Sequence, residues 1–325
     1  MSSPVLVTGG AGYIGSHIVR QLVERECKVV VLDDLSTGNS QRVQGAEMVI
    51  GSIEDAKLVT ELLTDLSIAT VVHMAAKTQA SASVYDPITF YNKNTVATLS
   101  LITSCVDTGV ENFVFASTAA VYTNSEAGCQ VNESSPTVPN TPYGASKLMT
   151  ERMLADIGRL NRIRHVSLRC FNVAGSNGNV ACQAPSAEGA LLLDAACQVA
   201  SGRRDRLVIY GDDFPTPDGT GVRDFIHVDD IASAHLCAIN YLEGGGASIV
   251  LNCGYGKGYS VREVIDAVER QWGCCIPVHV AERRPGDAAS LVANPSLIKE
   301  IMGWHPKNDD LDAIVRSALR RESKH

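Results

Sequence analysis

Short apolar runs rich in β-branched residues alternate with helix-length segments through the first half of the chain. Six such runs predict strands, at Pro4–Thr8, Lys28–Leu32, Glu47–Ile50, Thr70–His73, Asn112–Ser117 and His165–Arg169. Strands without a polar face that alternate with helices are typical of a parallel sheet covered on both faces. The pattern therefore predicts an α/β fold with a Rossmann-like, doubly wound parallel sheet.

This rhythm changes after Phe171, where residues 172–186 are rich in Gly, Asn, Ala and Pro and show no clear period. Strand-like runs at 206–210 and 224–228 and a helical run at 229–241 follow. Ser260 and Glu263 have the spacing of a capping box and predict a helix that ends near Trp272. With 325 residues available, we predict a nucleotide-binding Rossmann domain over 1–172, to which 223–245 returns. A smaller α/β substrate-binding lobe is predicted over 173–325.

Composition narrows the class of protein. A 45% share of hydrophobic residues is typical of a folded chain, and a net charge of -8 argues against nucleic-acid partners and anionic membranes. The apolar runs are much shorter than the ~20 residues of a membrane helix, and the first strand leaves no room for an export signal. The ten cysteines include no Cys-x-x-Cys pair, so we interpret them mostly as reduced core residues and predict no metal site. These features predict a cytoplasmic protein.

A glycine-rich loop follows the first strand. Gly9, Gly12 and Gly15 recur every third residue, just before an amphipathic segment that runs to Glu24. Glycines at a strand-to-helix turn allow a pyrophosphate to approach the backbone N–H groups and the positive helix end, although a tight turn alone could explain them. Asp33 ends the second strand, where a carboxylate accepts hydrogen bonds from ribose hydroxyls. Asp33 and Asp34 would repel a 2′-phosphate, which favours NAD over NADP.

A second pattern carries candidate acid–base chemistry. Thr141 and Pro142 predict the start of a helix, and Tyr143 and Lys147 then share one face because they lie four residues apart. Lowering the pKa of a tyrosine from about 10 to about 7 requires roughly 4 kcal/mol. An ammonium group about 4 Å away supplies approximately that much at an effective dielectric constant of about 20, and the nicotinamide cation of NAD would add to it. Tyr143 is therefore a candidate general base.

These motifs together resemble the extended short-chain dehydrogenase/reductases and, among them, the UDP-glucose 4-epimerases. The resemblance extends from Val5 to about Lys299. It is carried by VTGGAGYIGSH, VVHMAA, STAAVY, PYGASK, RCFNVAG, GTGVRDFIHVDD and RRPGD.

The resemblance implies a role for each matching residue. Tyr143 is the base, Lys147 positions the nicotinamide ribose, and Thr118 hydrogen-bonds the reacting oxygen. The implied NAD-binding residues are Gly9, Gly12, Tyr13, Ile14, Gly15, Asp33, Asp34, Ser52, Ile53, Met74, Ala75, Ala76, Lys77, Asn94, Ser117, Tyr143, Lys147 and Cys170. The implied substrate-binding residues are Thr118, Tyr143, Asn172, Tyr210, Arg223, Arg284 and Asp287, with both arginines on the diphosphate of a UDP-sugar. A homodimer is the default for this family.

The implied reaction is the interconversion of UDP-glucose and UDP-galactose, or a related pair, through a 4-keto sugar. Related dehydratases carry an acidic residue just after the Ser/Thr, whereas Ala119 and Ala120 follow Thr118 here. The acidic residue that the elimination reaction of a dehydratase requires is therefore absent at this position. Two alternatives remain open: another NAD-dependent nucleotide-sugar reductase or dehydrogenase, and a non-catalytic NAD-binding protein of the same fold.

Several positions depart from the family pattern. Ser52 stands where an Asp usually lies beside the adenine, and Cys170 replaces a Tyr. Leu191 falls near a usually polar position, Lys77 lies one place before the usual Lys, and Leu291 replaces a residue type associated with hexose-pocket size. These changes affect the choice of sugar more than the hydride chemistry. We interpret Cys170 as a packing residue and His73 and His227 as core or strand-end histidines.

Overall fold

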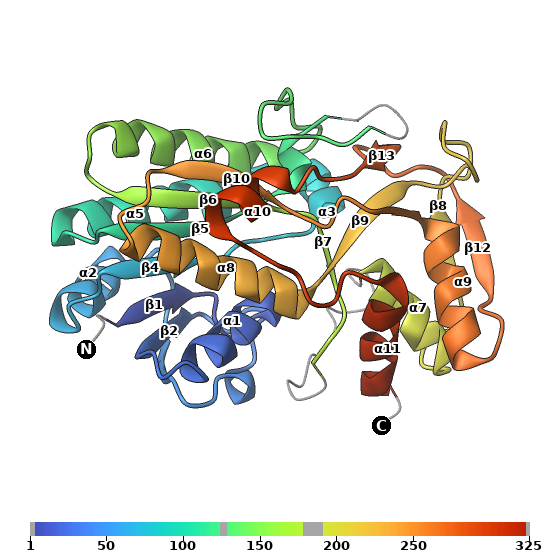
Figure 1. Ribbon diagram of the computed structural model, residues 1–325, viewed down its shortest axis with the longest axis horizontal. Coiled ribbons are helices and arrows are strands. Elements are labelled where there is room, and N and C mark those ends of the chain that lie inside the picture. The colour runs from blue at the N-terminus through green and yellow to red at the C-terminus, as the bar shows by residue number, and fades with distance from the viewer. Residues whose placement is uncertain (1–3, 124–128, 178–190, 323–325) are drawn as a thin grey trace.

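A seven-stranded parallel sheet forms the centre of the protein (Figure 1). The computed structural model describes residues 4–123, 129–177 and 191–322. Across the sheet the strand order is β10-β6-β5-β4-β1-β2-β3. The bounds are β1 Val5–Thr8, β2 Val29–Asp33, β3 Glu47–Ile50, β4 Thr70–His73, β5 Asn112–Thr118, β6 Arg164–Cys170 and β10 Ile249–Cys253. The doubly wound parallel sheet predicted from the sequence is thus confirmed, and its order reverses between β1 and β4.

Helices cover both faces of this sheet. Strand residues such as Leu6 and Phe113 pack with α2 (Ala56–Asp65), α5 (Ala97–Thr108) and α6 (Pro142–Arg159). Their neighbours Val7 and Val114 point the other way, toward α1 (Tyr13–Val23) and α8 (Val228–Glu243). Because successive side chains in a strand alternate between faces, apolar residues at every position place both faces in the core.

Capping interactions define the helices that matter most for the site. Thr141 accepts a hydrogen bond from the Gly144 N–H at 3.2 Å, with Pro142 in the first turn of α6. The predicted capping box is also present at α9 (Val261–Trp272), where Ser260 and Glu263 bond reciprocally. Shorter elements complete this half of the chain: η1 Ser40–Arg42, α3 Ala80–Tyr85, α4 Pro87–Tyr91, the π-helix η2 Asn92–Val96 and η3 Ala119–Val121.

A smaller group of elements lies beyond the carboxyl ends of the strands (Figure 1). Within it β9 pairs with β7, β11 and β13, while β8 and β12 form a parallel pair. The bounds are β7 Asn172–Ala174, α7 Leu192–Ala200, β8 Leu207–Tyr210, β9 Val222–His227, β11 Gly258–Ser260, β12 Val278–Ala281, β13 Ser290–Leu291 and α11 Leu311–Glu322. Helix α10 (Ser296–Met302) lies instead against β10 and α8, beside the large sheet (Figure 1).

Two later segments belong to the large sheet. Helix α8 packs against α1, β5 and β6, and β10 pairs with β6 at the edge of the sheet. The sequence pattern suggested the first return but did not reveal β10. The boundaries at 172 and 173 stay a prediction, because the chain crosses between the two groups more than once. No helix within the described residues has the length and apolar character needed to cross a membrane.

Candidate active site

The three glycines after β1, at positions 9, 12 and 15, are present for different structural reasons. A Cβ on Gly15 would lie 2.2 Å from the Gly9 carbonyl oxygen, and one on Gly9 would lie 2.6 Å from the Ala75 nitrogen. Both positions need glycine for the fold itself. A Cβ on Gly12 would meet only the Gly9 oxygen, at 3.2 Å, and no side chain caps α1 at this residue. Gly12 therefore leaves the first turn of α1, Tyr13 to Gly15, open to a pyrophosphate.

Asp33 ends β2 beside this loop and is buried. Its two carboxylate oxygens accept hydrogen bonds from the N–H groups of Ala11 and Leu35, each at 2.9 Å. Burial raises the pKa of Asp33, while these hydrogen bonds and the charge of Arg42 oppose the shift. Each carboxylate oxygen keeps a lone pair for a ribose hydroxyl. Asp34, in contrast, is exposed and bonds to Ser36 of its own loop.

Tyr143 and Lys147 lie on one face of α6 at the carboxyl end of β5. A hydrogen bond joins the Tyr143 side chain to Thr118, the last residue of β5. The Lys147 Nζ donates to the Ala116 carbonyl oxygen at 2.9 Å and lies 4.8 Å from the centre of the Phe115 ring. The structure therefore brings the three predicted catalytic residues to one strand end.

Burial determines the protonation of this group in the absence of a cofactor. Burial raises the pKa of Tyr143 to about 12, and the Thr118 hydrogen bond only partly opposes it. Burial also lowers the pKa of Lys147 to about 8. Without a bound cofactor the phenol of Tyr143 is therefore not near neutrality, because removal of water from the phenolate raises its pKa. A further positive charge beside Tyr143 is needed for the phenol to act as a base.

Behind this group lies a buried polar network that the sequence analysis missed. Glu151, one turn after Lys147 on α6, accepts hydrogen bonds from Ser117 at 2.5 Å and from the Arg169 Nη2 at 2.7 Å. Arg169 also donates to the Tyr122 hydroxyl, at 2.8 Å. The side chain of Ser117 is thus committed to α6, which leaves its backbone for the predicted cofactor contact. The four-residue spacing from Tyr143 to Lys147 to Glu151 was the available signal.

The π-helix η2 holds Asn94 against the catalytic helix. Its side chain bonds both the N–H and the carbonyl of Lys77, at 2.8 and 2.9 Å, and donates to the Ser146 hydroxyl at 3.1 Å. Ser146 in turn donates to the Tyr143 carbonyl at 2.7 Å. A π-helical turn widens the backbone by one residue and often marks a functional site. Asn94 therefore fixes the backbone after β4 and holds the start of α6 in place.

The other predicted cofactor residues also lie at the carboxyl edge of the sheet. Met74, Ala75 and Ala76 are half-buried directly after β4, with the Met74 N–H bonded to the Thr8 carbonyl at 2.9 Å. Lys77 is exposed there. Ser52 is half-buried after β3, where its hydroxyl accepts from the Glu54 N–H, and Ile53 is a core residue. Cys170, half-buried at the end of β6, is adjacent to Thr118 across the sheet.

The predicted substrate residues gather in the smaller group of elements. The Arg284 guanidinium lies 4.6 Å from the centre of the Tyr210 ring and bonds Asp287 at 2.9 Å. Burial lowers the pKa of Arg223, the nearby charge of Arg284 lowers it further, and Asp287 opposes both. Two guanidinium groups facing one carboxylate leave a net positive charge, which suits a diphosphate.

This cluster approaches the catalytic helix through one loop. A Cβ on Gly286 would lie 2.7 Å from the Thr141 side chain, so the loop that carries Arg284 approaches the start of α6 at Gly286. Asn172 is exposed at the start of β7. Leu291 on β13 is buried against the core that includes Phe171 and Leu148. Leu191 is half-buried just before α7. The loop at Gly286 therefore lies between the two arginines, Arg223 and Arg284, and the helix that carries Tyr143.

Both histidines singled out from the sequence are buried structural residues. His73 lies between Thr8 and Thr98, at 2.7 and 2.9 Å, and burial lowers its pKa to about 3. His227 caps α8 and bonds Ser317 at 3.1 Å. The interpretation of both as core or strand-end histidines is confirmed.

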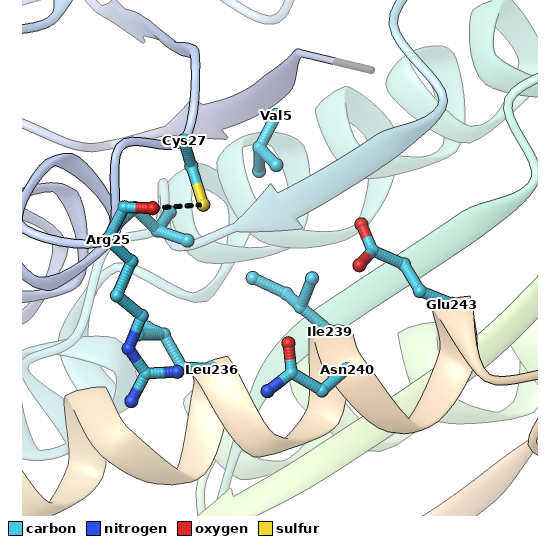
Figure 2. A pocket seen from close by; sticks show the side chains of 8 residues that line it. Val5, Arg25, Cys27, Leu236, Ile239, Asn240 and Glu243 are labelled. Atoms are coloured by element: carbon cyan, nitrogen blue, oxygen red, sulfur yellow. Dashed lines mark hydrogen bonds between the residues drawn. The ribbon is translucent and has the colours of Figure 1, made fainter. Parts of the chain in front are cut away.

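A separate hollow lies at the opposite, amino end of the sheet (Figure 2). It has a volume of about 40 Å³ and lies between the start of β1 and α8. Its lining comprises Val5, Leu22, Arg25, Cys27, Leu236, Ile239, Asn240 and Glu243. A hollow of this volume holds a few water molecules at most, so it is too small for a dinucleotide or a sugar.

Comparison with known proteins places this geometry in a family. Residues 5–254 match the family described as the NAD dependent epimerase/dehydratase family. The chain is 46% identical over 324 residues to a UDP-glucose 4-epimerase from Azospirillum brasilense, covering 99% of this chain and 92% of that protein. It is 40% identical over 321 residues to one from Halalkalibacterium halodurans, covering 99% of this chain and 96% of that protein.

Solved structures agree over the whole length. A UDP-glucose 4-epimerase from Stenotrophomonas maltophila, with bound NAD and formylated UDP-arabinopyranose, superimposes with a TM-score of 0.94 at 35% identity, covering 99% of this chain and 98% of that one. The UDP-Glc/GlcNAc 4-epimerase from Campylobacter jejuni gives 0.84 at 41% identity, covering 100% of both chains. Since the family match spans most of the chain and full-length relatives exceed 30% identity, the chain belongs to the NAD dependent epimerase/dehydratase family.

Proposed function

We propose that this protein is an NAD-dependent epimerase that interconverts UDP-glucose and UDP-galactose at C4. One observation carries the proposal. Tyr143, hydrogen-bonded to Thr118 and on the same face of α6 as Lys147, is joined through the contact of Gly286 with Thr141 to the Arg223 and Arg284 cluster. A proton acceptor and a diphosphate site are thus parts of one arrangement. Full-length similarity to UDP-glucose 4-epimerases supports the same reaction.

The residues present fit NAD. Gly12 leaves the uncapped first turn of α1 open, and Asp33 retains acceptor capacity for the adenosine ribose. Tyr13, Ile14 and the residues after β4 would complete the contact. When bound, NAD supplies the hydride acceptor and a positive charge. That charge is of the sign needed to bring the Tyr143 pKa down from about 12.

The protein's own residues then have distinct tasks. Tyr143 takes the proton from the sugar hydroxyl and returns it later, and Thr118 hydrogen-bonds the same oxygen. Lys147, fixed by the Ala116 carbonyl, keeps a cation near the phenol. Arg223 and Arg284 hold the diphosphate while Tyr210 stacks beside them. Anchoring the nucleotide rather than the sugar allows the keto sugar to present either face.

The decisive experiment is incubation of the pure protein with UDP-galactose and NAD, with the products separated by chromatography. We expect UDP-glucose to form until equilibrium, with no net change in NADH absorbance. Formation of NADH in proportion to product would instead indicate a dehydrogenase. Absence of UDP-glucose at saturating NAD would reject the proposal. UDP-N-acetylglucosamine belongs in the same panel, because the Campylobacter jejuni relative is described as a UDP-Glc/GlcNAc 4-epimerase.

We also propose that two copies form a symmetric dimer through α3 to α6. Large apolar side chains are exposed on these consecutive, mutually packed elements, namely Tyr85, Ile88, Val96, Leu99 and Met149. Apolar patches of this kind are typical of protein interfaces. Light scattering is expected to give the dimer mass, and Ile88→Asp to give the monomer mass. Ile50→Asp, which replaces another exposed isoleucine at the end of β3, is the control. A monomeric wild-type protein would reject this proposal.

We propose that the protein is located in the cytoplasm. The nine cysteines in the described part of the chain are all free thiols, as a reducing compartment maintains them. Fractionation of the native host, with the protein followed by antibody, tests this location.

A further inference from the structure

Two cysteines that are far apart in the sequence lie side by side next to the catalytic group. Cys170 ends β6 and Cys253 ends β10, and the two are direct partners in the parallel register. On the other side of β6, the register partner of Cys170 is Thr118. Register partners in a parallel sheet point to the same face, so Thr118, Cys170 and Cys253 form one row across three strand ends.

The spacing of this pair suits a covalent bond. Neighbouring strands lie about 4.8 Å apart, within the range of about 4.4–6.8 Å between Cα atoms that disulfides span. The two thiol groups are close enough to interact, because the presence of Cys170 raises the pKa of Cys253. Closing the bond requires only a small approach of the two Cβ atoms, from the strand spacing toward about 3.8 Å.

The surroundings give the two thiols different roles. Cys170 is half-buried and interacts electrostatically with both Lys147 and Tyr143. Cys253 is fully buried, and its interaction with Cys170 and its burial raise its pKa. Cys170 is therefore the group that an external reagent meets first, and Cys253 is placed to displace it.

We propose that Cys170 and Cys253 form a dithiol site that is reversibly oxidised by low-molecular-weight disulfides. The Cys170 thiolate attacks one sulfur of the reagent, its S–S bond breaks, and one thiol leaves with a proton. Cys253 then loses its proton and attacks the Cys170 sulfur of the mixed disulfide, which releases the second thiol. Two protein thiols are oxidised to one disulfide, and one small disulfide is reduced to two thiols.

Oxidation changes the catalytic edge of the sheet directly. It draws Cys170 toward β10 and away from Thr118 and Tyr143, with which it interacts in the reduced protein. It also removes the Cys170 thiol from beside Lys147. Since small displacements of catalytic groups cost much of the rate, the oxidised protein is expected to turn over at least ~5-fold more slowly.

The test treats the purified full-length protein with oxidised glutathione and maps its peptides without reduction. We expect a cross-linked peptide pair that contains Cys170 and Cys253, with a mass about 2 Da below that of the two reduced peptides. Dithiothreitol should restore both the peptides and the rate. This mass readout does not depend on the substrate, so it stands apart from the epimerase assay.

Two variants separate this pair from the other cysteines. Cys253→Ala removes the displacing thiol, and we expect a stable glutathione adduct on Cys170 without a cross-link. Cys274→Ser, at an exposed cysteine outside the site, should leave the cross-link unchanged. Recovery of Cys170 and Cys253 as free thiols, or a stable adduct on Cys170 in the wild-type protein, would overturn the proposal. A cross-link with an unchanged rate would overturn the effect on turnover.

Discussion

Glu151 and Arg169 form a buried, two-pronged ion pair directly behind the catalytic residues. The Arg169 Nη2 lies 2.7 Å from the Glu151 Oε2, and the Nε lies 3.0 Å from the Oε1. The pair ties α6, which carries Tyr143 and Lys147, to the strand that ends at Cys170. The positions of the catalytic side chains relative to the sheet therefore depend on this contact.

Removing one member of this pair is expected to be costly. Glu151→Ala leaves the Arg169 guanidinium buried without its partner, which should lower the free energy of unfolding by about 3–5 kcal/mol. Urea denaturation followed by circular dichroism measures this change. Glu54→Ala is the matched control, because its pair with Lys93 has the same 2.7 Å distance but is over 40% exposed. The control should lose less than about 1 kcal/mol, and equal losses would contradict the argument.

The two glycines of the nucleotide loop should respond differently to alanine. Gly15→Ala puts a Cβ 2.2 Å from a backbone oxygen, so we expect insoluble or strongly destabilised protein. Gly12→Ala has a φ of -73° that alanine adopts and only one close neighbour, so it should fold normally. Its methyl group stands where a pyrophosphate approaches, and NAD affinity should fall at least ~10-fold. Calorimetric titration measures this affinity. Unchanged NAD binding in a folded Gly12→Ala protein would show that the pyrophosphate does not bind next to Gly12.

Tyr143→Phe removes the proposed base and keeps the ring. We expect turnover to fall at least ~100-fold while NAD binding stays close to normal, which is the scale of lost general-base catalysis. Initial rates with UDP-galactose and a parallel NAD titration separate the two effects. Tyr241→Phe, at a half-buried tyrosine near the end of α8, is the control and should keep the wild-type rate. A near-normal rate for Tyr143→Phe would remove this residue from the mechanism.

We expect the buried ammonium group of Lys147 to lower the stability of the folded protein. Burial lowers its pKa from the ordinary 10.5 to about 8, so the folded protein disfavours the charged form. Between these two values the unfolded chain binds more protons than the folded one, and the lysine's contribution makes stability rise with pH. Below about 8 the penalty for the buried ammonium is present in full.

Lys147→Met is therefore expected to be inactive yet more stable than the wild type at about pH 7. This advantage should shrink as the pH rises from about 8 toward 10.5. Thermal unfolding of both proteins across this window gives the difference, in which the other titrating groups cancel. A variant less stable than the wild type at neutral pH would show that the hydrogen bond to Ala116 outweighs the burial of charge.

Arg284 should affect substrate binding more than the chemical step. Arg284→Ala removes the guanidinium that stacks on Tyr210, and the KM for the UDP-sugar is expected to rise about 10- to 100-fold, the range for a lost charge-assisted hydrogen bond. Steady-state kinetics gives kcat and KM separately. The neighbouring Arg283, which pairs with Asp213 and stacks on Phe214, is the control, and Arg283→Ala should change KM less than about threefold. A fall in kcat alone would assign Arg284 a different role.

Local sequence determined much of this protein. The apolar runs predicted the strands of the large sheet up to β6 to within a residue at either end, because strands buried on both faces must be apolar throughout. Thr141, Ser260 and the glycine loop identified helix starts, since capping needs only neighbouring residues. The resemblance then supplied candidate residues that the structure gathers along the carboxyl edge of the sheet and in the adjoining smaller group of elements.

Tertiary structure alone decided the rest. Strand β10, the Glu151–Arg169 pair and the Cys170–Cys253 pair all join residues far apart in the chain, and no local pattern records which strands become neighbours. The effect of burial on the pKa values of Tyr143 and Lys147 could not be predicted from the sequence either. Spacing along a helix indicates which charges are close but not how much water is excluded around them.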